Sequence, residues 1–274
     1  MCKPVIKWVG GKRQLIDEIK ANMPKKFNRY FEPFIGGGAL FFELKAKDAI
    51  ICDYNEELTN LYEVIKNKPL ELIKDLKKHI NSEEYYYNLR ALDRDQKRYK
   101  RVSKVKRASR FIFLNKTGYN GLWRVNKKGQ HNVPFGKYKN PTIFEEENIL
   151  KCSKLLQTTT IINGDFEKIK EYIKEGDFIY LDPPYVPINN TSNFTAYTDQ
   201  GFDEDMQFRL KKLCDYIDSI GAYFLLSNSC TEFITDLYKG YEIVSVSANR
   251  ALNCKADKRG KIKEVLVKNY GTYK

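Results

Sequence analysis

The chain has few of the residues that build metal centres or disulfide frameworks. It contains two histidines and six cysteines, and the cysteines lie at 2, 52, 152, 214, 230 and 254 with no Cys-x-x-Cys pair. Neither His79 nor His131 stands at ligand-like spacing to a cysteine. Zinc sites and secreted disulfide scaffolds both depend on such spacing. The sequence therefore predicts no metal, and free thiols that are mostly buried.

Long hydrophobic runs are missing as well. No stretch approaches the 18 apolar residues of a membrane span, and the mean hydropathy is −0.57. The first eight residues lack the apolar core of a secretory signal. A hydrophobic content of 42 % and an aromatic content of 14 % exclude global disorder. We expect a soluble, cytoplasmic protein with a packed core and no membrane partner.

One long segment has no acidic residue. Between Gln96 and Phe144 there is no Asp or Glu, while 14 Lys and Arg side chains fall there. The whole chain carries +13, so the remainder carries only −1. A solvated helix face usually mixes Glu with Lys, so this pattern instead indicates a surface that binds a polyanion, with nucleic acid as the first candidate.

Apolar patterns divide the chain into three parts. Residues 1–54 show a helix at 15–22, a strand at 30–35, a glycine turn, a helix at 39–44 and a strand at 49–52, which is the order of a βαβ unit. Residues 146–274 return to this alternation, with strands at 160–162, 177–181 and 222–227 and an antiparallel edge hairpin of 241–246 and 264–270. We predict an α/β fold in which these two parts form one domain.

The middle part, residues 55–145, differs in pattern. Helical periodicity covers 56–66, 69–80, 82–95 and 102–114, and a polar stretch rich in Gly, Asn and Lys then runs to Pro141. A loop of that length inside a compact domain is usually functional or mobile. We interpret 55–145 as a helical insertion that carries a basic loop.

Asp182-Pro183-Pro184-Tyr185 directly follows the apolar strand that ends at Leu181. Two prolines fix the backbone and donate no hydrogen bond, so nearby carbonyls stay available as acceptors. A carboxylate, a carbonyl and an aromatic face at the end of a strand can bind a planar amine, with the Tyr185 ring stacked on it. The alternative is an ordinary loop in which proline ends the strand.

Three weaker signals lie near the N-terminus. The run from Phe31 to Gly38 is a glycine-rich turn after a strand, although it lacks the G-x-G-x-x-G spacing of dinucleotide sites. Asp53 ends the next strand, where it could bind ribose hydroxyls or cap the following helix. Lys12 follows two glycines without the spacing of a phosphate loop, so it could hold a ligand carboxylate. Trp8 is a candidate cofactor wall or a core residue.

Several of these motifs, in this order, resemble the Dam-type DNA adenine-N6 methyltransferases. The resemblance rests on Trp8-Val9-Gly10-Gly11-Lys12, on 31–38, on Asn120-Gly121-Leu122-Trp123-Arg124-Val125-Asn126, on 132–138, on Asp182-Pro183-Pro184-Tyr185, on Phe194-Thr195-Ala196-Tyr197 and on Leu226-Ser227-Asn228-Ser229. It spans nearly the whole chain and is closest to the GATC-methylating members of restriction–modification systems, with the motif order of the α group.

The resemblance implies a Rossmann-like sheet that uses S-adenosylmethionine, with 55–145 as a target-recognition insertion. It implies that the cofactor is held by Trp8, Lys12, Pro33, Phe34, Gly36, Gly38, Asp53, Asp165, Phe166 and Asp182. It implies that Asp182, Pro183 and Tyr185 act on a flipped adenine. It implies that duplex DNA is contacted by Lys7, Tyr119, Asn120, Leu122, Arg124, Pro134 and Tyr138. Trp123 has no assigned role.

The residue-level analysis agrees with this resemblance. Adenine N6 lies inside a base pair, so the base must leave the stack to reach Tyr185. Transfer is then a direct in-line displacement, in which Asp182 and the Pro183 carbonyl orient the amine. Two alternatives stay open here: a methyltransferase for RNA or a protein amide, and a catalytically silent DNA-binding relative. A restriction endonuclease of the same system is a further expected partner.

Overall fold

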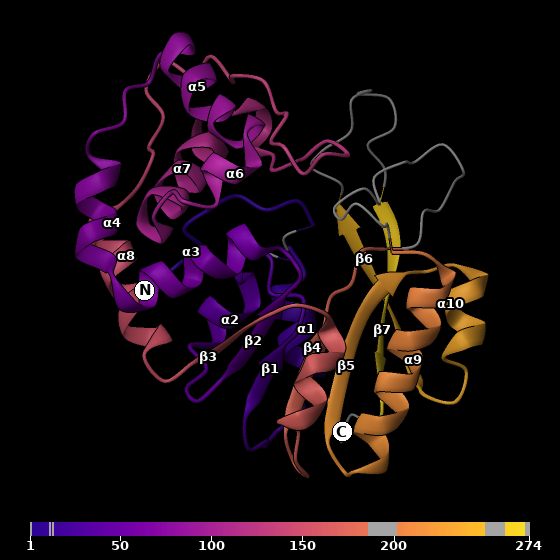
Figure 1. Cartoon of the computed structure of the whole chain (residues 1–274). Helices are drawn as coiled ribbons and strands as arrows, with labels where there is room; N and C mark the ends of the chain where they lie inside the picture. Colours follow the sequence, from indigo (N-terminus) through magenta and orange to yellow (C-terminus); the bar gives the residue numbers. More distant parts are fainter. Residues whose placement is uncertain (1, 11, 13, 186–201, 250–260, 272–274) are drawn as a thin grey trace. The chain divides into compact units, whose positions relative to one another are not determined.

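The computed structural model describes residues 2–10, 12, 14–185, 202–249 and 261–271, and it divides into two compact units (Figure 1). The first unit comprises Met1–Gly11 and Ile35–Asp165, and the second comprises Lys12–Phe34 and Phe166–Lys274. This division differs from the predicted domains, 1–54 with 146–274 against 55–145, and those domain boundaries stay a prediction.

The first unit contains parallel strands with helices packed on them. Strand β2 (Ile50–Asp53) and strand β3 (Thr160–Asn163) form where the apolar runs predicted strands, and the two pair in parallel. Helix α3 (Glu56–Asn67) packs on both strands and on α8 (Glu146–Leu156). The short helix α2 (Ala39–Leu44) follows the glycine turn and buries the side chains of Leu40, Phe41 and Phe42.

The insertion is helical, and α7 (Lys104–Thr117) lies at its centre. Helix α7 packs against α3, α4 (Pro69–Leu76) and α5 (Glu83–Arg90), as Figure 1 shows. Ser82 and Ser103 cap α5 and α7, because each hydroxyl accepts the backbone N–H three residues later. Three short turns complete the insertion: η1 (Ala91–Arg94), α6 (Gln96–Tyr99) and η2 (Tyr119–Gly121).

The predicted helix over 82–95 is wrong in its second half. Helix α5 ends at Arg90 and continues as the 3₁₀ turn η1. Arg110 explains the break, because its guanidinium donates to the carbonyls of Leu89 and Arg90 at 2.9 Å each. A side chain from α7 thus satisfies carbonyls that the end of a helix leaves without partners.

The described residues of the second unit form five strands, in the order β1-β4-β5-β7-β6. Strands β1 (Tyr30–Glu32), β4 (Phe178–Leu181) and β5 (Tyr223–Ser229) are parallel neighbours. The predicted hairpin of β6 (Glu242–Asn249) and β7 (Lys261–Lys268) is confirmed as antiparallel. However, β7 also pairs with β5, so of the two hairpin strands only β6 lies at an edge. Seven strands form within the described part of the chain, most of them in parallel pairs, and the prediction of a Rossmann-like α/β fold is confirmed.

The helices of the second unit are α1 (Ile16–Asn22), η3 (Phe166–Glu171), α9 (Glu204–Ser219) and α10 (Glu232–Leu237). Helix α9 packs on β5 (Figure 1). Within the described ranges, no helix of either unit combines the length and hydrophobicity that a bilayer span needs. Among the described residues, the cysteines form no disulfide with one another, and Cys52, Cys152 and Cys214 are buried.

Candidate functional site

Three predicted site residues meet at the carboxyl end of β4. Asp182 follows the fully buried strand, and the Lys12 ammonium lies 3.0 Å from its Oδ1. The same ammonium lies 4.2 Å from the centre of the Tyr185 ring. Lys12 is only 9 % exposed and Asp182 only 19 %, so water screens this ion pair weakly. The structure therefore joins an acceptor, a cation and an aromatic face in one buried cluster.

The environment of Asp182 changes its acidity. Burial raises the pKa of Asp182 to about 6, the Lys12 ammonium opposes this rise, and the Glu264 carboxylate adds to it. Burial also raises the pKa of the Tyr185 phenol well above its usual value, and Asp182 and Glu264 act in the same direction. At neutral pH, Asp182 is therefore mostly an acceptor-only carboxylate, while Tyr185 keeps its proton.

Glu264 belongs to this cluster, although the sequence analysis missed it. The Tyr185 hydroxyl donates to Glu264 Oε2 at 2.7 Å, and the Lys12 ammonium lies 4.0 Å from the same oxygen. Glu264 lies on β7, 79 residues after Tyr185. One signal was available: an acidic residue placed directly before the apolar run Val265-Leu266-Val267 of a predicted strand. Only the pairing of β7 with β5 brings it near the end of β4.

Aromatic side chains gather beside the chain that leaves β1. Phe34 packs on Phe166, with ring centres 5.3 Å apart, and both contact Phe202 at 5.8 and 6.1 Å. Phe166 is 3 % exposed, and the Arg209 guanidinium lies 5.2 Å from its ring centre. Two predicted cofactor residues, far apart in sequence, thus meet in an apolar wall, and Pro33 precedes that wall in the chain.

In the first unit, the glycine turn lies against Trp8. Gly36 has φ +46°, and a Cβ atom built there would lie 2.7 Å from Trp8 Cδ1. A side chain at Gly36 would therefore need the indole to move. The Tyr62 hydroxyl donates to the Gly36 carbonyl at 2.7 Å, and Gly38, at φ +69°, begins α2. The half-buried indole also stacks on Phe111, 6.3 Å away between ring centres.

Asp53 joins this turn and does not cap the helix. Its Oδ2 accepts the Gly36 N–H at 3.1 Å, and its Oδ1 accepts the Asn55 N–H at 2.9 Å. The cap of α3 is Asn55, whose side chain accepts from Glu57 and Leu58. Burial raises the pKa of Asp53 to about 6 despite these N–H groups, which act to lower it. Asp165 lies in the same unit, two residues after β3.

The basic loop brings together DNA-contact candidates that lie more than 100 residues apart. The Asn120 N–H donates to the Tyr138 hydroxyl at 3.0 Å, and the Lys7 ammonium lies 5.7 Å from the Tyr138 ring centre. Buried Asn115 holds the arrangement: its side chain bonds to both backbone groups of Lys7, at 2.8 and 2.9 Å, and to the Gly121 carbonyl at 2.8 Å. Asn115 is a second positioning residue that sequence reasoning missed.

The other loop candidates lie on the same segment. The Tyr119 N–H donates to the Pro134 carbonyl at 2.9 Å, and the Tyr119 side chain is 54 % exposed. Arg124 is exposed, and its Nε donates to Asn132 Oδ1 at 2.7 Å, while Leu122 is half-buried. These contacts place exposed aromatic and basic groups on one loop.

Trp123 now has a structural role. It is 7 % exposed, and its ring lies between Phe111 at 3.9 Å and His131 at 4.4 Å, measured between ring centres. It therefore fills the space between α7 and the loop.

Not every basic residue of the acid-free segment lies on the surface with its charge exposed. Most of them are exposed, but Arg110 is 2 % exposed and pairs with Asp93, and Arg107 is bonded to Glu56 and Glu57. The interpretation of all 14 charges as one polyanion-binding surface is corrected here, because these two arginines neutralise acids from outside the segment. The remaining charges still make the segment basic.

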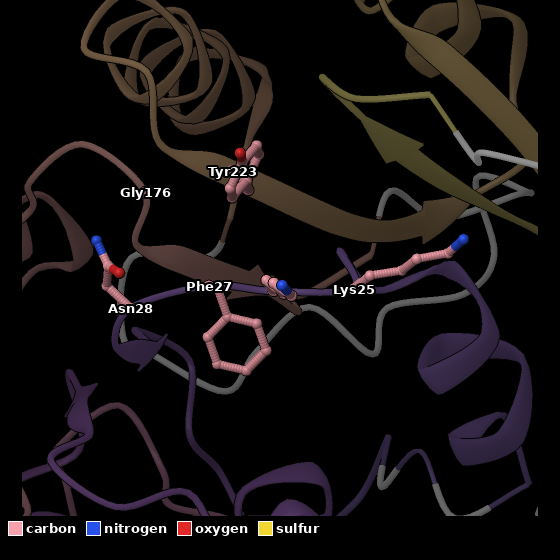
Figure 2. Close-up of a pocket in the computed structure, with 6 residues that line it drawn as sticks. Lys25, Phe27, Asn28, Gly176 and Tyr223 are labelled. Atoms are coloured by element: carbon pink, nitrogen blue, oxygen red, sulfur yellow. The ribbon is translucent and has the colours of Figure 1, made fainter.

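The described residues also line an open pocket of about 600 Å³, formed by Lys25, Lys26, Phe27, Asn28, Gly176 and Tyr223 (Figure 2). It lies at the amino ends of β1, β4 and β5, whereas Asp182 follows the carboxyl end of β4. It holds none of the predicted site residues. Across the described ranges, no three His, Cys, Asp or Glu side chains are placed to hold a metal ion. The predicted motif 194–197 lies outside the described residues.

Comparison with known proteins agrees with the motifs. The sequence model of the D12 class N6 adenine-specific DNA methyltransferases matches residues 8–252. A type II methyltransferase of Lactococcus lactis subsp. cremoris, M1.LlaDCHI, is 47 % identical over 98 % of this chain and 96 % of its own. A type II methyltransferase of Methanocaldococcus jannaschii, M.MjaIII, is 46 % identical over 98 % and 99 %. The DNA adenine methylase of Escherichia coli (strain K12) is 31 % identical over 95 % and 93 %.

These matches cover almost the whole chain, including both compact units and the basic loop. They decide against the two alternatives that the residues left open, a methyltransferase for RNA or a protein amide and a catalytically silent relative, because the matched family consists of adenine-specific DNA methyltransferases. The chain belongs to the D12 class N6 adenine-specific DNA methyltransferases, and it is an adenine-specific DNA methyltransferase enzyme.

Proposed function

We propose that this enzyme methylates adenine N6 at GATC in duplex DNA, with S-adenosylmethionine as the methyl donor and the target base flipped out of the helix. The observation that carries this proposal is the buried cluster of Lys12, Asp182 and Tyr185 after β4. The GATC assignment rests on the recognition-loop motifs of 120–126 and 132–138.

The chain's donor and acceptor groups fit such a cofactor. The Asp53 carboxylate accepts the backbone N–H groups of Gly36, Tyr54 and Asn55, and a carboxylate has about four acceptor positions, so it keeps capacity for one ribose hydroxyl. The side chains of Trp8, Phe34 and Phe166 offer apolar walls, and Gly36 and Gly38 allow close approach of the backbone. The bound cofactor would supply an electrophilic methyl group on a sulfonium. Asp165, Pro33 and Lys12 complete the proposed binding set.

Asp182 and the Pro183 carbonyl would accept the two N–H groups of the adenine amine. Fixing both hydrogens orients the nitrogen for in-line attack, and the nearby negative charge favours the positive charge that develops on it. The Tyr185 ring would stack on the base, and its hydroxyl is held by Glu264 at 2.7 Å. No covalent bond between the enzyme and the base is part of this proposal.

The basic loop would bind the duplex. Lys7, Tyr119, Asn120, Leu122, Pro134 and Tyr138 would contact or wedge the target, and Arg124 would bind a guanine edge with two hydrogen bonds. In the structure the Arg124 guanidinium is exposed and already fixed at Nε by Asn132, which leaves its orientation defined.

A digestion assay tests the sequence assignment. The enzyme is expressed in cells that lack adenine methylation, and their DNA is cut with a GATC nuclease blocked by methylation and with one that requires it. We expect protection from the first and cleavage by the second, with the Asp182→Ala enzyme as the inactive control. Methylation detected only at another sequence would contradict GATC while leaving adenine methylation intact.

The names of two relatives suggest a partner. Both relatives at 46–47 % identity are named type II methyltransferases. We therefore propose that this enzyme protects host DNA from a restriction endonuclease that cuts the same sequence. The digestion assay also tests this proposal. Cells tolerate such an endonuclease only if nearly all of their GATC sites are methylated, so we expect nearly complete protection from the methylation-blocked nuclease.

A further inference from the structure

The loop strand that carries Asn132 is anchored on its inner side. His131 and Val133 are both buried at 0 % exposure, while Asn132 between them is half-buried and bonds to Arg124 at 2.7 Å. The neighbouring backbone also ties these parts together, since the Asn132 N–H donates to the Arg124 carbonyl at 3.0 Å. The position of the Arg124 side chain therefore depends on where the 131–133 backbone lies.

Charged side chains of η1 hold both backbone groups of His131. Its N–H donates to Asp93 Oδ2 at 2.8 Å, and its carbonyl accepts from Arg94 Nη2 at 2.8 Å. The His131 ring packs against Trp123, and among the described residues its Nδ1 atom has no hydrogen-bond partner. Burial holds the pKa of this imidazole well below its usual value, so the ring is neutral.

The last turns of α5 hold Val133 in the same way. Its carbonyl accepts from the Tyr86 hydroxyl at 3.0 Å and from Arg90 Nη1 at 2.9 Å. The backbone groups of His131 and Val133 thus make four hydrogen bonds with side chains of α5 and η1: one N–H donates and two carbonyls accept three. A surface loop normally satisfies its backbone with water, so this density of fixed partners is unusual for a loop.

One of these anchors, Asp93, belongs to a buried ion pair, and its other oxygen pairs with Arg94 at 2.7 Å. Arg110 Nη2 donates to Asp93 Oδ2 at 2.7 Å, and the two side chains are 2 % and 5 % exposed. Arg110 also holds the carbonyls that end α5, so it places Tyr86 and Arg90 as well as Asp93. A buried ion pair contributes little net stability compared with apolar packing, which makes a role in fixing conformation a reasonable hypothesis.

We propose that Asp93 and Arg110 form a positioning pair that sets the orientation of Arg124 and so determines how strictly the enzyme discriminates its target sequence. Asp93 holds the His131 backbone, that backbone carries Asn132, and Asn132 holds the Arg124 guanidinium. The inference rests on the proposed reading of a guanine edge by Arg124.

The test measures kcat/KM on GATC and on its single-base variants for Asp93→Asn, Arg124→Ala and the double variant. We expect Asp93→Asn to reduce the discrimination ratio about tenfold, because a loosened arginine loses the geometry of a two-bond contact. We expect no further reduction when Asp93→Asn is added to Arg124→Ala, because both changes act through the same side chain. The KM for the cofactor should stay unchanged.

Asp177→Asn is the matched control. Asp177 is also a buried carboxylate, 1 % exposed, that pairs with an arginine, Arg29, at 2.6 Å and accepts backbone N–H groups, but it lies in the second unit. The Asp177→Asn variant should lose thermal stability as Asp93→Asn does. Its discrimination between GATC and the single-base variants should stay unchanged. Where Asp93→Asn does not fold, Tyr86→Phe removes one of the four anchors and should reduce discrimination in the same direction.

Three results separate the possible failures. An equal loss of kcat/KM on every sequence in Asp93→Asn would overturn the positioning pair and leave a stabilising ion pair. Additive losses of discrimination in the double variant would overturn it too. If Arg124→Ala leaves discrimination unchanged, the base-reading role of Arg124 is wrong and the positioning pair with it, even when the wild-type enzyme methylates GATC.

Discussion

The proposed methyl transfer depends on the carboxylate of Asp182. Its Oδ1 lies 3.0 Å from the Lys12 ammonium, which in turn lies 4.2 Å from the centre of the Tyr185 ring. We expect Asp182→Ala to lower the single-turnover methylation rate by about 10²–10³-fold, the effect of removing one fixed electrostatic group from an active site. DNA affinity, measured by gel shift, should change little. A rate above about a tenth of wild type would remove Asp182 from the catalytic role.

The acidity of Asp182 makes a second prediction. Its pKa is raised to about 6, so protonation below that pH removes the acceptor, and kcat/KM should fall on the acid side of about pH 6. Glu264 raises this pKa and Lys12 lowers it. Glu264→Gln should therefore move the acid limb to lower pH, and Lys12→Met should move it to higher pH.

The measurement is kcat/KM against pH for the three enzymes on one duplex. Glu71→Gln, a change on α4 at a side chain that is 60 % exposed, serves as a charge-matched control and should leave the limb in place. Shifts of the two limbs in the same direction would mean that Asp182 is not the titrating group.

The turn η2 contains a glycine that lies against Lys7, one of the proposed DNA-contact residues. Gly121 has φ +65°, and a Cβ atom there would overlap the Lys7 side chain at Cδ. We expect Gly121→Ala to weaken binding of target DNA several-fold more than Gly129→Ala, a change in the same loop. Gly129 has φ +69° with nothing within 4 Å, so both changes carry the backbone strain of about 1–2 kcal/mol, but only one displaces Lys7.

Competition titrations with labelled duplex compare the two variants. Equal effects would show that the contact between Gly121 and Lys7 is not needed for binding and that only backbone strain matters.

Charge across the whole molecule makes a different kind of prediction. The enzyme carries +13, most of it exposed on one segment, so its affinity for any duplex should fall steeply with salt. Lys127 and Lys128 are exposed at the tip of the loop. If both contact phosphates, replacing both with Ala should reduce the slope of log affinity against log salt by about 2.

This double variant should weaken cognate and non-cognate binding equally, since phosphates carry no base identity. A loss confined to GATC would mean that one of the two lysines contacts a base.

Several features followed from the sequence alone because they depend on neighbours in the chain. The β4 strand and its Asp-Pro-Pro-Tyr ending, the glycine turn at 36–38 and the acid-free segment are local patterns, and each was located correctly. The β6–β7 hairpin also followed, because strands that are consecutive in the sequence are usually neighbours in the sheet.

Only the tertiary structure decided which distant side chains meet. Glu264 contacts Tyr185 because of the register in which β7 pairs with β5. Arg110 is not on the charged surface: it bonds to a carbonyl at the end of α5 and pairs with Asp93. Asp53 binds the Gly36 turn, while Asn55 caps α3. Composition records the charge of a residue but not its partner, because the partner is set by how strands and helices pack. The sequence could therefore indicate a DNA-binding segment, but only the folded structure shows the buried ion pair of Asp93 and Arg110.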